Sequence, residues 1–266
     1  MTGVPSAGSG WRLLVVNCNT SRAMTASITD VARSASAPGT TVTGIEPAWG
    51  PESAEGYFES YVTAAAVMDA VSTYRGEFDA VIMAGYGEHG REGMRQLLDV
   101  PVVDITEASA MLACLVSRRF GVITTLAQAI PGIEDSLSGI GLMSRCSGIR
   151  ATSLPVTGIA EDPTHTFDAL TAAGRELIAG GADSLVLGCA GFAGLDSELE
   201  AELGVPVFDS VASAVTLAES LLNLGKTTSA VGPFAAPSSG KAWRGWPVSP
   251  IPGGHQRAAQ STLLVE

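Results

Sequence analysis

Residues 79–87 read Asp-Ala-Val-Ile-Met-Ala-Gly-Tyr-Gly, and residues 183–191 read Asp-Ser-Leu-Val-Leu-Gly-Cys-Ala-Gly. Each stretch has an acidic residue, then a continuous apolar run, then a turn of small residues. Such an apolar run is typical of a strand that is covered on both faces in a parallel sheet. The two stretches lie 104 residues apart, which indicates that the two halves of the chain repeat one another.

Two further matches keep the same order and nearly the same spacing. Val100-Pro-Val-Val-Asp104 corresponds to Val205-Pro-Val-Phe-Asp209, and residues 13–17 correspond to residues 121–125. Buried parallel strands resemble one another in any protein, so a single match would carry little weight. Three matches in register favour a duplication, and we expect two similar lobes related by a pseudo-two-fold axis.

The rest of the chain alternates short β-branched runs with longer Ala-rich stretches, which predicts repeated β-α units. Strands are predicted at residues 13–17, 41–45, 80–84, 100–104, 121–125, 151–155, 184–188 and 205–209. Helices are predicted at residues 23–34, 61–74, 90–98, 108–117, 130–140, 166–180 and 210–224. The expected fold class is α/β, with parallel sheets in both lobes and the active site in the cleft between them.

The last predicted helix is expected to return to the first lobe, which makes that lobe discontinuous. The first lobe is then residues 11–106 plus 207–225, and the second is residues 107–206. Composition shifts after Gly225, because residues 226–265 lack acidic residues and are dense in Gly, Pro, Ser and Ala. Residues 226–266 are predicted to form an extended or flexible tail; the alternative is that Trp243 and Trp246 anchor this tail to another subunit.

Composition bounds the class of protein. The chain has 266 residues, of which 46% are hydrophobic and 16% charged, so it can bury a large core. Its net charge of -12 has the wrong sign for binding nucleic acid or an anionic membrane. We expect neither a signal peptide nor a membrane span, since no apolar run is long enough. The four cysteines are widely spaced, which favours a reducing, cytoplasmic compartment.

Cys189 follows a buried strand in a turn flanked by Gly188 and Gly191. Backbone N–H groups of such a turn can point at an anion, so the thiol is placed to act as an acid/base group or a nucleophile. The alternative is a small buried cysteine with no chemical role. The matching turn in the first half has Gly85 in the place of this cysteine.

A second polar cluster follows the first predicted strand. Asn17-Cys18-Asn19-Thr20-Ser21 offers amide, thiol and hydroxyl groups at the start of a helix, where an anion is favoured. The same residues are also a plain helix-capping sequence. Thr124 and Thr125 occupy the equivalent place in the second half.

Five motifs taken in order resemble the hydantoin racemase group of the aspartate/glutamate racemase superfamily. The resemblance runs from about Leu13 to Gly225. It implies two similar α/β lobes, a small-molecule substrate, no cofactor and a homo-oligomer, with one active-site cysteine from each lobe facing the α-carbon. No metal site is expected, because no His or Cys lies at ligand spacing. The motifs are Asn17-Cys-Asn19-Thr20-Ser21, Gly50-Pro51-Glu-Ser-Ala-Glu-Gly56-Tyr57, Pro101-Val-Val-Asp-Ile-Thr-Glu-Ala108, Phe120-Gly-Val-Ile-Thr-Thr125 and Leu187-Gly188-Cys189-Ala190-Gly191.

By this resemblance Cys189 is the catalytic thiol of the second lobe. Two positions depart from the family: its Asn-Pro-Asn-Thr has Cys18 in place of proline, and its first-lobe cysteine is Gly85. Inverting a stereocentre needs an acid/base group on each face, so one group is missing, and the candidates to replace it are Cys18 and His89. The substrate-binding shell implied is Asn17, Thr20, Gly85, Tyr86, Gly87, Thr124, Thr125, Ala190 and Gly191.

The leading hypothesis is therefore a cofactor-independent racemase or epimerase acting on a small amide or amino-acid derivative. One alternative is a lyase that uses Cys189 alone, similar to the arylmalonate decarboxylases, in which a glycine stands at the first position and the second cysteine is kept. Another is a non-catalytic homologue that binds a small ligand. Glu46, Asp104 and Glu107 are interpreted as solvated or capping carboxylates, since no His or Cys lies at ligand spacing.

Overall fold

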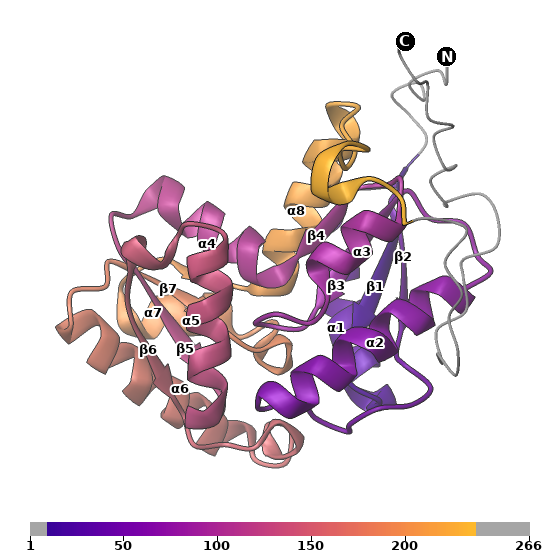
Figure 1. Cartoon of the computed structure of the whole chain (residues 1–266). Helices are drawn as coiled ribbons and strands as arrows, with labels where there is room; N and C mark the ends of the chain where they lie inside the picture. The colour runs from indigo at the N-terminus through magenta and orange to yellow at the C-terminus, as the bar shows by residue number, and fades with distance from the viewer. Residues whose placement is uncertain (1–9, 238–266) are drawn as a thin grey trace, which may run out of the picture.

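The structure is a computed structural model that describes residues 10–237, and it contains two four-stranded sheets, all of whose strands run parallel (Figure 1). The first sheet has the order β2-β1-β3-β4 and the second the order β6-β5-β7-β8, so the two sheets correspond strand for strand. The predicted α/β fold class is confirmed. The strands are β1 Arg12–Asn17, β2 Thr41–Ile45, β3 Ala80–Ala84, β4 Val102–Asp104, β5 Phe120–Thr124, β6 Cys146–Ala151, β7 Ser184–Leu187 and β8 Val207–Phe208.

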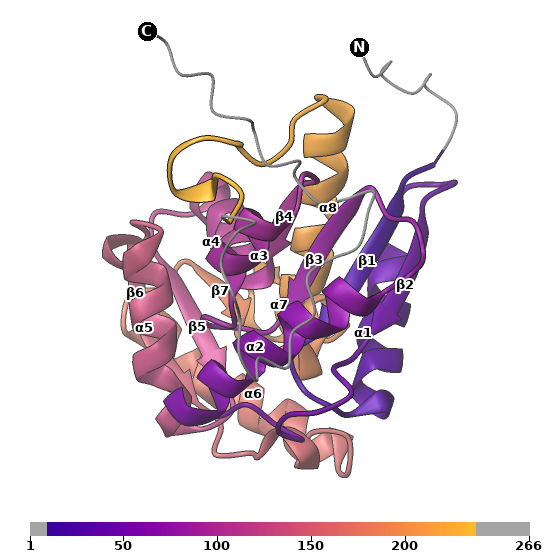
Figure 2. The ribbon, with the colours of Figure 1, turned by 45° about the vertical axis from the view of Figure 1, so that its right-hand side comes forward.

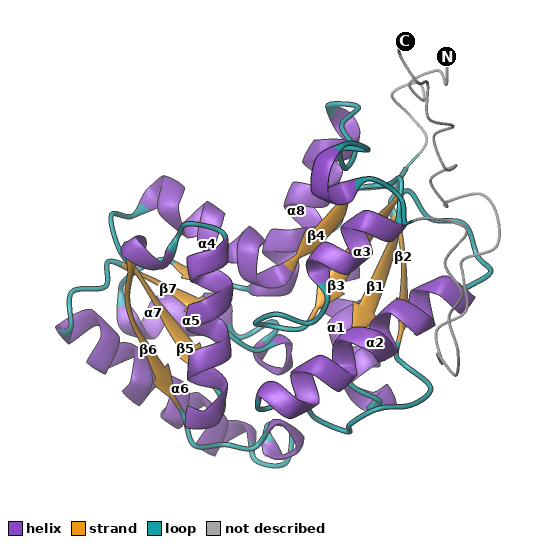
Figure 3. Ribbon diagram, in the orientation of Figure 1, coloured by secondary structure: helices purple, strands orange, loops and turns teal. Residues whose placement is uncertain are grey.

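Helices cover both faces of each sheet (Figure 3). The first sheet packs against α1 and α8 on one face and α2 and α3 on the other, and the second packs against α6 and α7 on one face and α5 on the other. None of the helices within residues 10–237 is long and apolar enough to cross a membrane. The α-helices are α1 Arg22–Ala35, α2 Tyr57–Thr73, α3 Arg91–Leu97, α4 Ile105–Val116, α5 Ile130–Gly139, α6 Pro163–Ala179, α7 Asp196–Leu203 and α8 Ser210–Asn223. Short 3-10 helices are η1 Ala127–Ala129, η2 Met143–Arg145, η3 Val156–Gly158, η4 Ala190–Phe192 and η5 Gly232–Phe234.

Helix α4 connects the two lobes. Ala108 packs with the core of the first sheet, whereas Ala110 and Ala113 pack with the core of the second. Ala, Leu and Ile on several sides of one helix allow it to be buried from both directions. Because α4 also packs along α8, these two helices form the joint at which the lobes meet.

Two elements differ from the sequence prediction. The strand expected at residues 151–155 is instead β6 at Cys146–Ala151. It is an edge strand whose residues are buried only in part, so it lacks the continuous apolar run that marks a central strand. Helix α7 was not predicted, since Leu199 is its one buried residue and no apolar periodicity appears.

The boundary predicted between the lobes also needs a correction. Strand β8 pairs with β7, so residues 207–208 belong to the second sheet although residues 207–225 were assigned to the first lobe. Helix α8 packs on the first sheet as expected, through Val211 and Val215. The remaining division of the chain, residues 11–106 and 107–206, stays a prediction, because α4 contributes to both cores.

The predicted tail is described only as far as residue 237. Its first part lies along α3 through η5, as Figure 2 shows, and Gln96 Nε2 donates a hydrogen bond to the Ala235 carbonyl at 3.0 Å. Residues 238–266, which include Trp243 and Trp246, lie outside the described residues.

Candidate active site

The turns that follow β3 and β7 meet between the two sheets. Tyr86 leaves the end of β3 and packs with buried residues of both lobes. A Cβ atom on Gly188 would lie 3.4 Å from the Tyr86 ring and only 2.8 Å from the Ile123 carbonyl oxygen. Gly188 is therefore required by close packing, and the two glycine turns lie against each other.

Cys189 stands at the start of η4, where backbone amides are free to point at its thiol. Gly191 N donates a hydrogen bond to Cys189 Sγ at 3.3 Å. Burial raises the pKa of Cys189 to about 11; the amides of Gly191 and Phe192 oppose this rise, and the charge of Glu55 adds to it. The amides supply the dipoles that a thiolate needs, as the turn sequence predicts.

Gly85 lies in a space that two other side chains fill. A Cβ atom at this position would stand 2.3 Å from His89 Cδ2, 2.6 Å from Cys18 Cβ and 3.1 Å from Cys18 Sγ. Real Cβ atoms do not approach this closely, so a cysteine at position 85 is incompatible with the present positions of Cys18 and His89. The thiol of Cys18 thus lies beside the place where a side chain on residue 85 would begin.

Cys18 is partly buried, and the charge of its thiol interacts with the second lobe. Burial raises its pKa to about 12, and the charge of Cys189 is the next largest contribution. The two thiols are therefore near enough for their charges to repel, although they come from different lobes. Asp104 also raises the pKa of Cys18.

His89 is buried against this same position. Its Nδ1 atom has no hydrogen-bond partner within the described residues. Burial lowers its pKa to about 4, against a smaller opposing effect from the Tyr86 backbone. His89 is consequently a neutral imidazole at pH 7, able to accept a hydrogen bond and poorly able to donate a proton. Burial also raises the pKa of Tyr86.

Most other residues predicted in the first-lobe shell hold their own loops. Asn17 Nδ2 donates to Asn19 Oδ1 at 2.9 Å and to Thr25 Oγ1 at 3.1 Å. Thr20 Oγ1 donates to the Pro51 carbonyl at 3.3 Å. Gly87 N donates to Thr106 Oγ1 at 2.8 Å. These groups shape the turns of the first lobe rather than presenting free donors.

The residues predicted for the substrate-binding shell in the second lobe also make hydrogen bonds or packing contacts within the protein. Thr124 Oγ1 donates to the Gly188 carbonyl at 3.4 Å, which ties the end of β5 to the Cys189 turn. Thr125 is buried and its carbonyl accepts a hydrogen bond from Thr152. Ala190 is buried in the first-lobe core. Gly191 is thus the predicted shell residue whose amide is aimed at the thiol.

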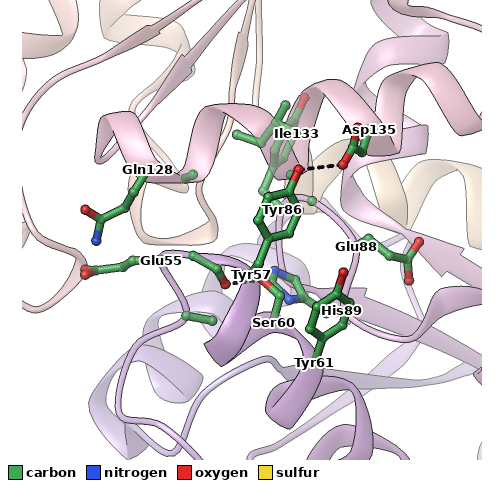
Figure 4. Close-up of a pocket in the computed structure, with 15 residues that line it drawn as sticks. Glu55, Tyr57, Ser60, Tyr61, Tyr86, Glu88, His89, Gln128, Ile133 and Asp135 are labelled. Atoms are coloured by element: carbon green, nitrogen blue, oxygen red, sulfur yellow. Dashed lines mark hydrogen bonds between the residues drawn. The ribbon is translucent and has the colours of Figure 1, made fainter.

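A cavity of about 190 Å³ lies next to these turns and is lined by both lobes (Figure 4). Neither Cys18 nor Cys189 is among its lining residues. It touches the thiol region through Glu55, whose charge acts on Cys189, and through His89, which lies beside Cys18. The lining residues are Ala54, Glu55, Gly56, Tyr57, Ser60, Tyr61, Tyr86, Gly87, Glu88, His89, Gln128, Ala129, Gly132, Ile133 and Asp135.

Several hydrogen bonds join the two lobes beside this cavity, and two of them use side chains that line it. Tyr57 on α2 donates from its hydroxyl to Asp135 Oδ2 on α5 at 2.6 Å (Figure 4). Val156 N donates to Glu55 Oε1 at 3.0 Å. Glu55, Tyr57 and Asp135 were not predicted as site residues. Glu55 and Tyr57 lie in one of the five motifs, which is the signal that could have identified them, whereas nothing in the local pattern of Asp135 marks it.

A sequence profile of the Asp/Glu/Hydantoin racemase family matches residues 13–218. The chain belongs to this family. It is similar to the crystal structure of allantoin racemase from Pseudomonas fluorescens, with 47% identity, a TM-score of 0.85, and coverage of 87% of this chain and 99% of that one. Allantoin racemase from Klebsiella pneumoniae is 34% identical, with a TM-score of 0.87 and coverage of 92% and 100%.

A hydantoin racemase from Pseudomonas sp. (strain NS671) is 35% identical over 228 residues, which is 85% of this chain and 92% of that relative. This family member is therefore an isomerase of the racemase type, and the resemblance stated from the five motifs is confirmed. The assignment of individual site residues stays a prediction.

Proposed function

We propose that this enzyme inverts a carbon next to a carbonyl in a small hydantoin or ureide, with Cys189 and Cys18 as opposing acid/base groups and no cofactor. The observation that carries the proposal is the position of Cys18. Its thiol stands 3.1 Å from where the Cβ of residue 85 would begin, and its charge interacts with that of Cys189. Cys18 thereby supplies the first-lobe thiol that Gly85 lacks.

The reaction requires one thiolate and one thiol. The thiolate removes the α-proton from one face, and the opposite thiol returns a proton to the other face. Cys189 is the better thiolate because the amides of Gly191 and Phe192 lower its pKa. Cys18 then begins the cycle as the thiol, and the two roles exchange for the opposite enantiomer.

His89 is the weaker candidate for the second base. An imidazole whose pKa is lowered to about 4 carries no proton to return at neutral pH. Its unpartnered Nδ1 lies on a residue that lines the cavity, so it is suited to accept a hydrogen bond from a substrate N–H group. We assign His89 to substrate binding, beside Glu55.

Substrate class is supported by the relatives and by the cavity. The relatives are racemases of hydantoin and allantoin, which are compact ureides with several N–H and C=O groups. The cavity offers carboxylate, imidazole and amide acceptors from Glu55, His89 and Gln128. The rings of Tyr57, Tyr61 and Tyr86 form part of its wall. A small apolar pocket with a few polar groups fits such a ring.

The test is to follow single-enantiomer allantoin, 5-substituted hydantoins, free amino acids and arylmalonates by NMR in D2O with the wild-type enzyme. We expect α-deuteration with inversion on a ureide. The matched control is Cys114→Ala, which removes a thiol far along the chain from both turns. Loss of CO2 from an arylmalonate without inversion of any ureide would replace the proposal with the one-thiol lyase, and binding without deuteration would indicate a non-catalytic homologue.

The cellular setting remains part of the proposal. We expect a cytoplasmic homo-oligomer that binds neither nucleic acid nor membranes, on the charge of -12 and the family resemblance. Light scattering coupled to gel filtration measures the oligomeric state, and a monomer at working concentration would contradict that expectation.

A further inference from the structure

Helix α5 of the second lobe carries two neighbouring residues whose side chains reach the first lobe. Asp135 accepts the hydrogen bond from Tyr57 that borders the cavity. Ser136, the next residue along, is 3% exposed, and its Oγ donates to the Gly87 carbonyl at 3.2 Å. The first of these hydrogen bonds is exposed, whereas the second is buried. Ser136 therefore joins α5 to the turn after β3 in the interior of the protein.

The Ser136 hydroxyl has a partner for each of its two hydrogen-bonding functions. It donates its proton to the Gly87 carbonyl, and its oxygen accepts from Arg91 Nη1 at 3.4 Å. Arg91 lies on α3, is 3% exposed, and is fixed by ion pairs with Glu88 at 3.0 Å and Glu92 at 2.9 Å. Both partners of the hydroxyl thus belong to the first lobe. A buried hydroxyl that is satisfied on both sides is held in one orientation.

The Gly87 carbonyl belongs to the turn that also carries Gly85 and His89. With glycine at positions 85 and 87, much of this turn has no side chain to pack, so hydrogen bonds from other elements fix its place. Within the described residues, Thr106 at the start of α4 bonds to both Gly87 N and Gly87 O, at 2.8 and 3.3 Å, and Ser136 adds the bond from α5. Cys18 and His89 fill the space beside Gly85, so a shift of the turn changes the surroundings of Cys18.

We propose that Ser136 is a positioning residue for the reaction. By holding Gly87, it fixes the turn after β3 against the second lobe, and with the turn it fixes the face of the site that Cys18 occupies. Ser136 does not line the cavity and acts through the turn, so it is not a catalytic residue. The kinetic consequence rests on the proposed function, in which Cys18 serves the first-lobe face, whereas the holding of the turn does not.

The proposal predicts which product is lost when the turn is loosened. Once Cys189 has removed the α-proton, the carbon receives a proton either from Cys18, which inverts it, or from Cys189 again, which restores its configuration. The Cys189 thiol is held by the Gly191 amide of its own lobe, and this contact does not involve Ser136. Ser136→Ala should therefore slow inversion more than it slows exchange with retention. A general loss of folded protein would slow both equally.

The kinetic experiment compares Ser136→Ala with the wild-type enzyme on allantoin in D2O. Each enantiomer is used in turn, because only one presents its α-proton to Cys189. The ratio of inversion to deuteration with retained configuration, followed by NMR and polarimetry, should fall about tenfold. The matched control is Ser138→Ala on the exposed side of the same helix, which should keep the wild-type ratio. A wild-type ratio in Ser136→Ala overturns the positioning role.

Hydrogen exchange measured by mass spectrometry tests the holding of the turn without turnover. Ser136→Ala removes the hydrogen bond from α5 to Gly87, so the amides of residues 85–91 should exchange about tenfold faster than in the wild type. The amides of residues 187–193, around the Cys189 turn, should exchange as before. Ser138→Ala should match the wild type in both segments. Unchanged exchange in residues 85–91 of Ser136→Ala would show that Ser136 does not hold the turn.

The two measurements separate this inference from the proposed function. If the turn loosens in Ser136→Ala and the ratio of inversion to retention stays at the wild-type value, Ser136 has a structural role alone and the positioning role is wrong. If the turn loosens and Cys18→Ala still inverts its substrate at the wild-type rate, the holding of the turn stands and the proposed role of Cys18 fails.

Discussion

The two lobes have the same strand order, but their thiols lie at different positions in that topology. In the second lobe the thiol stands on the turn after β7, where Gly191 N donates to it. In the first lobe the turn after β3 carries Gly85, and the thiol beside it comes from the loop after β1. In a repeated fold, the ends of neighbouring parallel strands lie close together. A thiol on the loop after β1 can therefore lie near the place that a thiol on the turn after β3 would occupy.

The surroundings of the two thiols differ as well. Cys189 has helix-end amides that lower its pKa, whereas Cys18 has Asp104 nearby, which raises its own. Burial is the largest effect for both and raises both values. We therefore expect the lobes to be unequal partners, with Cys189 the easier to ionise.

The largest expected effect comes from removing the second-lobe thiol. Cys189→Ala should reduce both kcat for inversion and the rate of deuteration at the α-carbon by about 10²–10⁴-fold, because the better thiolate is lost. The measurement is polarimetry with NMR in D2O, and Cys114→Ala is the control that should keep wild-type turnover. Undiminished deuteration in Cys189→Ala would remove Cys189 from the mechanism.

The next largest effect is expected from moving the first-lobe thiol from position 18 to position 85. Gly85→Cys alone should be strongly impaired, since its Cβ would stand 2.3 Å from His89 and 2.6 Å from Cys18. Cys18→Gly in the same chain removes one of these two obstacles and returns the thiol to the turn after β3. The double variant should invert substrate at least about tenfold faster than Gly85→Cys alone. Equal rates would show that the two positions are not interchangeable.

Acid should weaken the first lobe through His89. The pKa of His89 is lowered to about 4 in the folded protein, so the unfolded chain binds a proton at higher pH than the folded one. Stability from this group is complete above about pH 6.5 and is lost as pH falls toward 4, by about 3 kcal/mol, of which about 2 kcal/mol is lost between pH 7 and pH 5. Urea unfolding at pH 7 and pH 5 measures it.

The matched variant for this prediction is His89→Gln, which removes the titrating ring and keeps a polar side chain. Its free energy of unfolding should change less between the two pH values than that of the wild type. A His165→Gln control, on the exposed start of α6, should behave like the wild type. Identical pH dependence in His89→Gln and the wild type would contradict the burial of a neutral ring.

The smallest expected effect concerns the bridge between the lobes. Tyr57→Phe removes the 2.6 Å hydrogen bond to Asp135 and keeps the ring. We expect KM to rise about twofold to tenfold with little change in kcat, because the bridge borders the cavity and touches neither thiol. Tyr74→Phe makes the same chemical change on a ring that packs with Phe78 and does not line the cavity, and it should leave KM nearly unchanged. A fall in kcat at constant KM would place Tyr57 in the chemical step instead.

Most strands and helices could be predicted from the local pattern of apolar residues. Central strands such as β3 and β7 are continuous apolar runs, because both of their faces are covered, and the sequence shows them plainly. The edge strand β6 and the polar helix α7 were misplaced or missed, since partial burial leaves no such run. The candidate site divides in the same way, because the turn after β7 marks Cys189 in the sequence, and its catalytic role stays a prediction.

The contribution of the first lobe depended on contacts that no local pattern records. That Cys18 and His89 fill the space beside Gly85 is a result of three chain segments meeting after folding. Glu55, Tyr57 and Asp135 likewise come together only when the lobes do. Asn17 was predicted to bind substrate because it is a polar residue at a strand end. In the structure its side-chain amide donates hydrogen bonds to Asn19 and Thr25, so the same pattern also suits a residue that holds its own loop.

The central claim is that Cys18 opposes Cys189, and the most direct test is the stereochemical course of Cys18→Ala in D2O. One enantiomer of the substrate is incubated, and deuterium uptake and optical rotation are followed together. With the enantiomer whose α-proton faces Cys189, we expect Cys189 still to exchange that proton, giving deuterated substrate of retained configuration with inversion reduced at least about 100-fold. Inversion at the wild-type rate would show that another group serves the opposite face and would contradict the account.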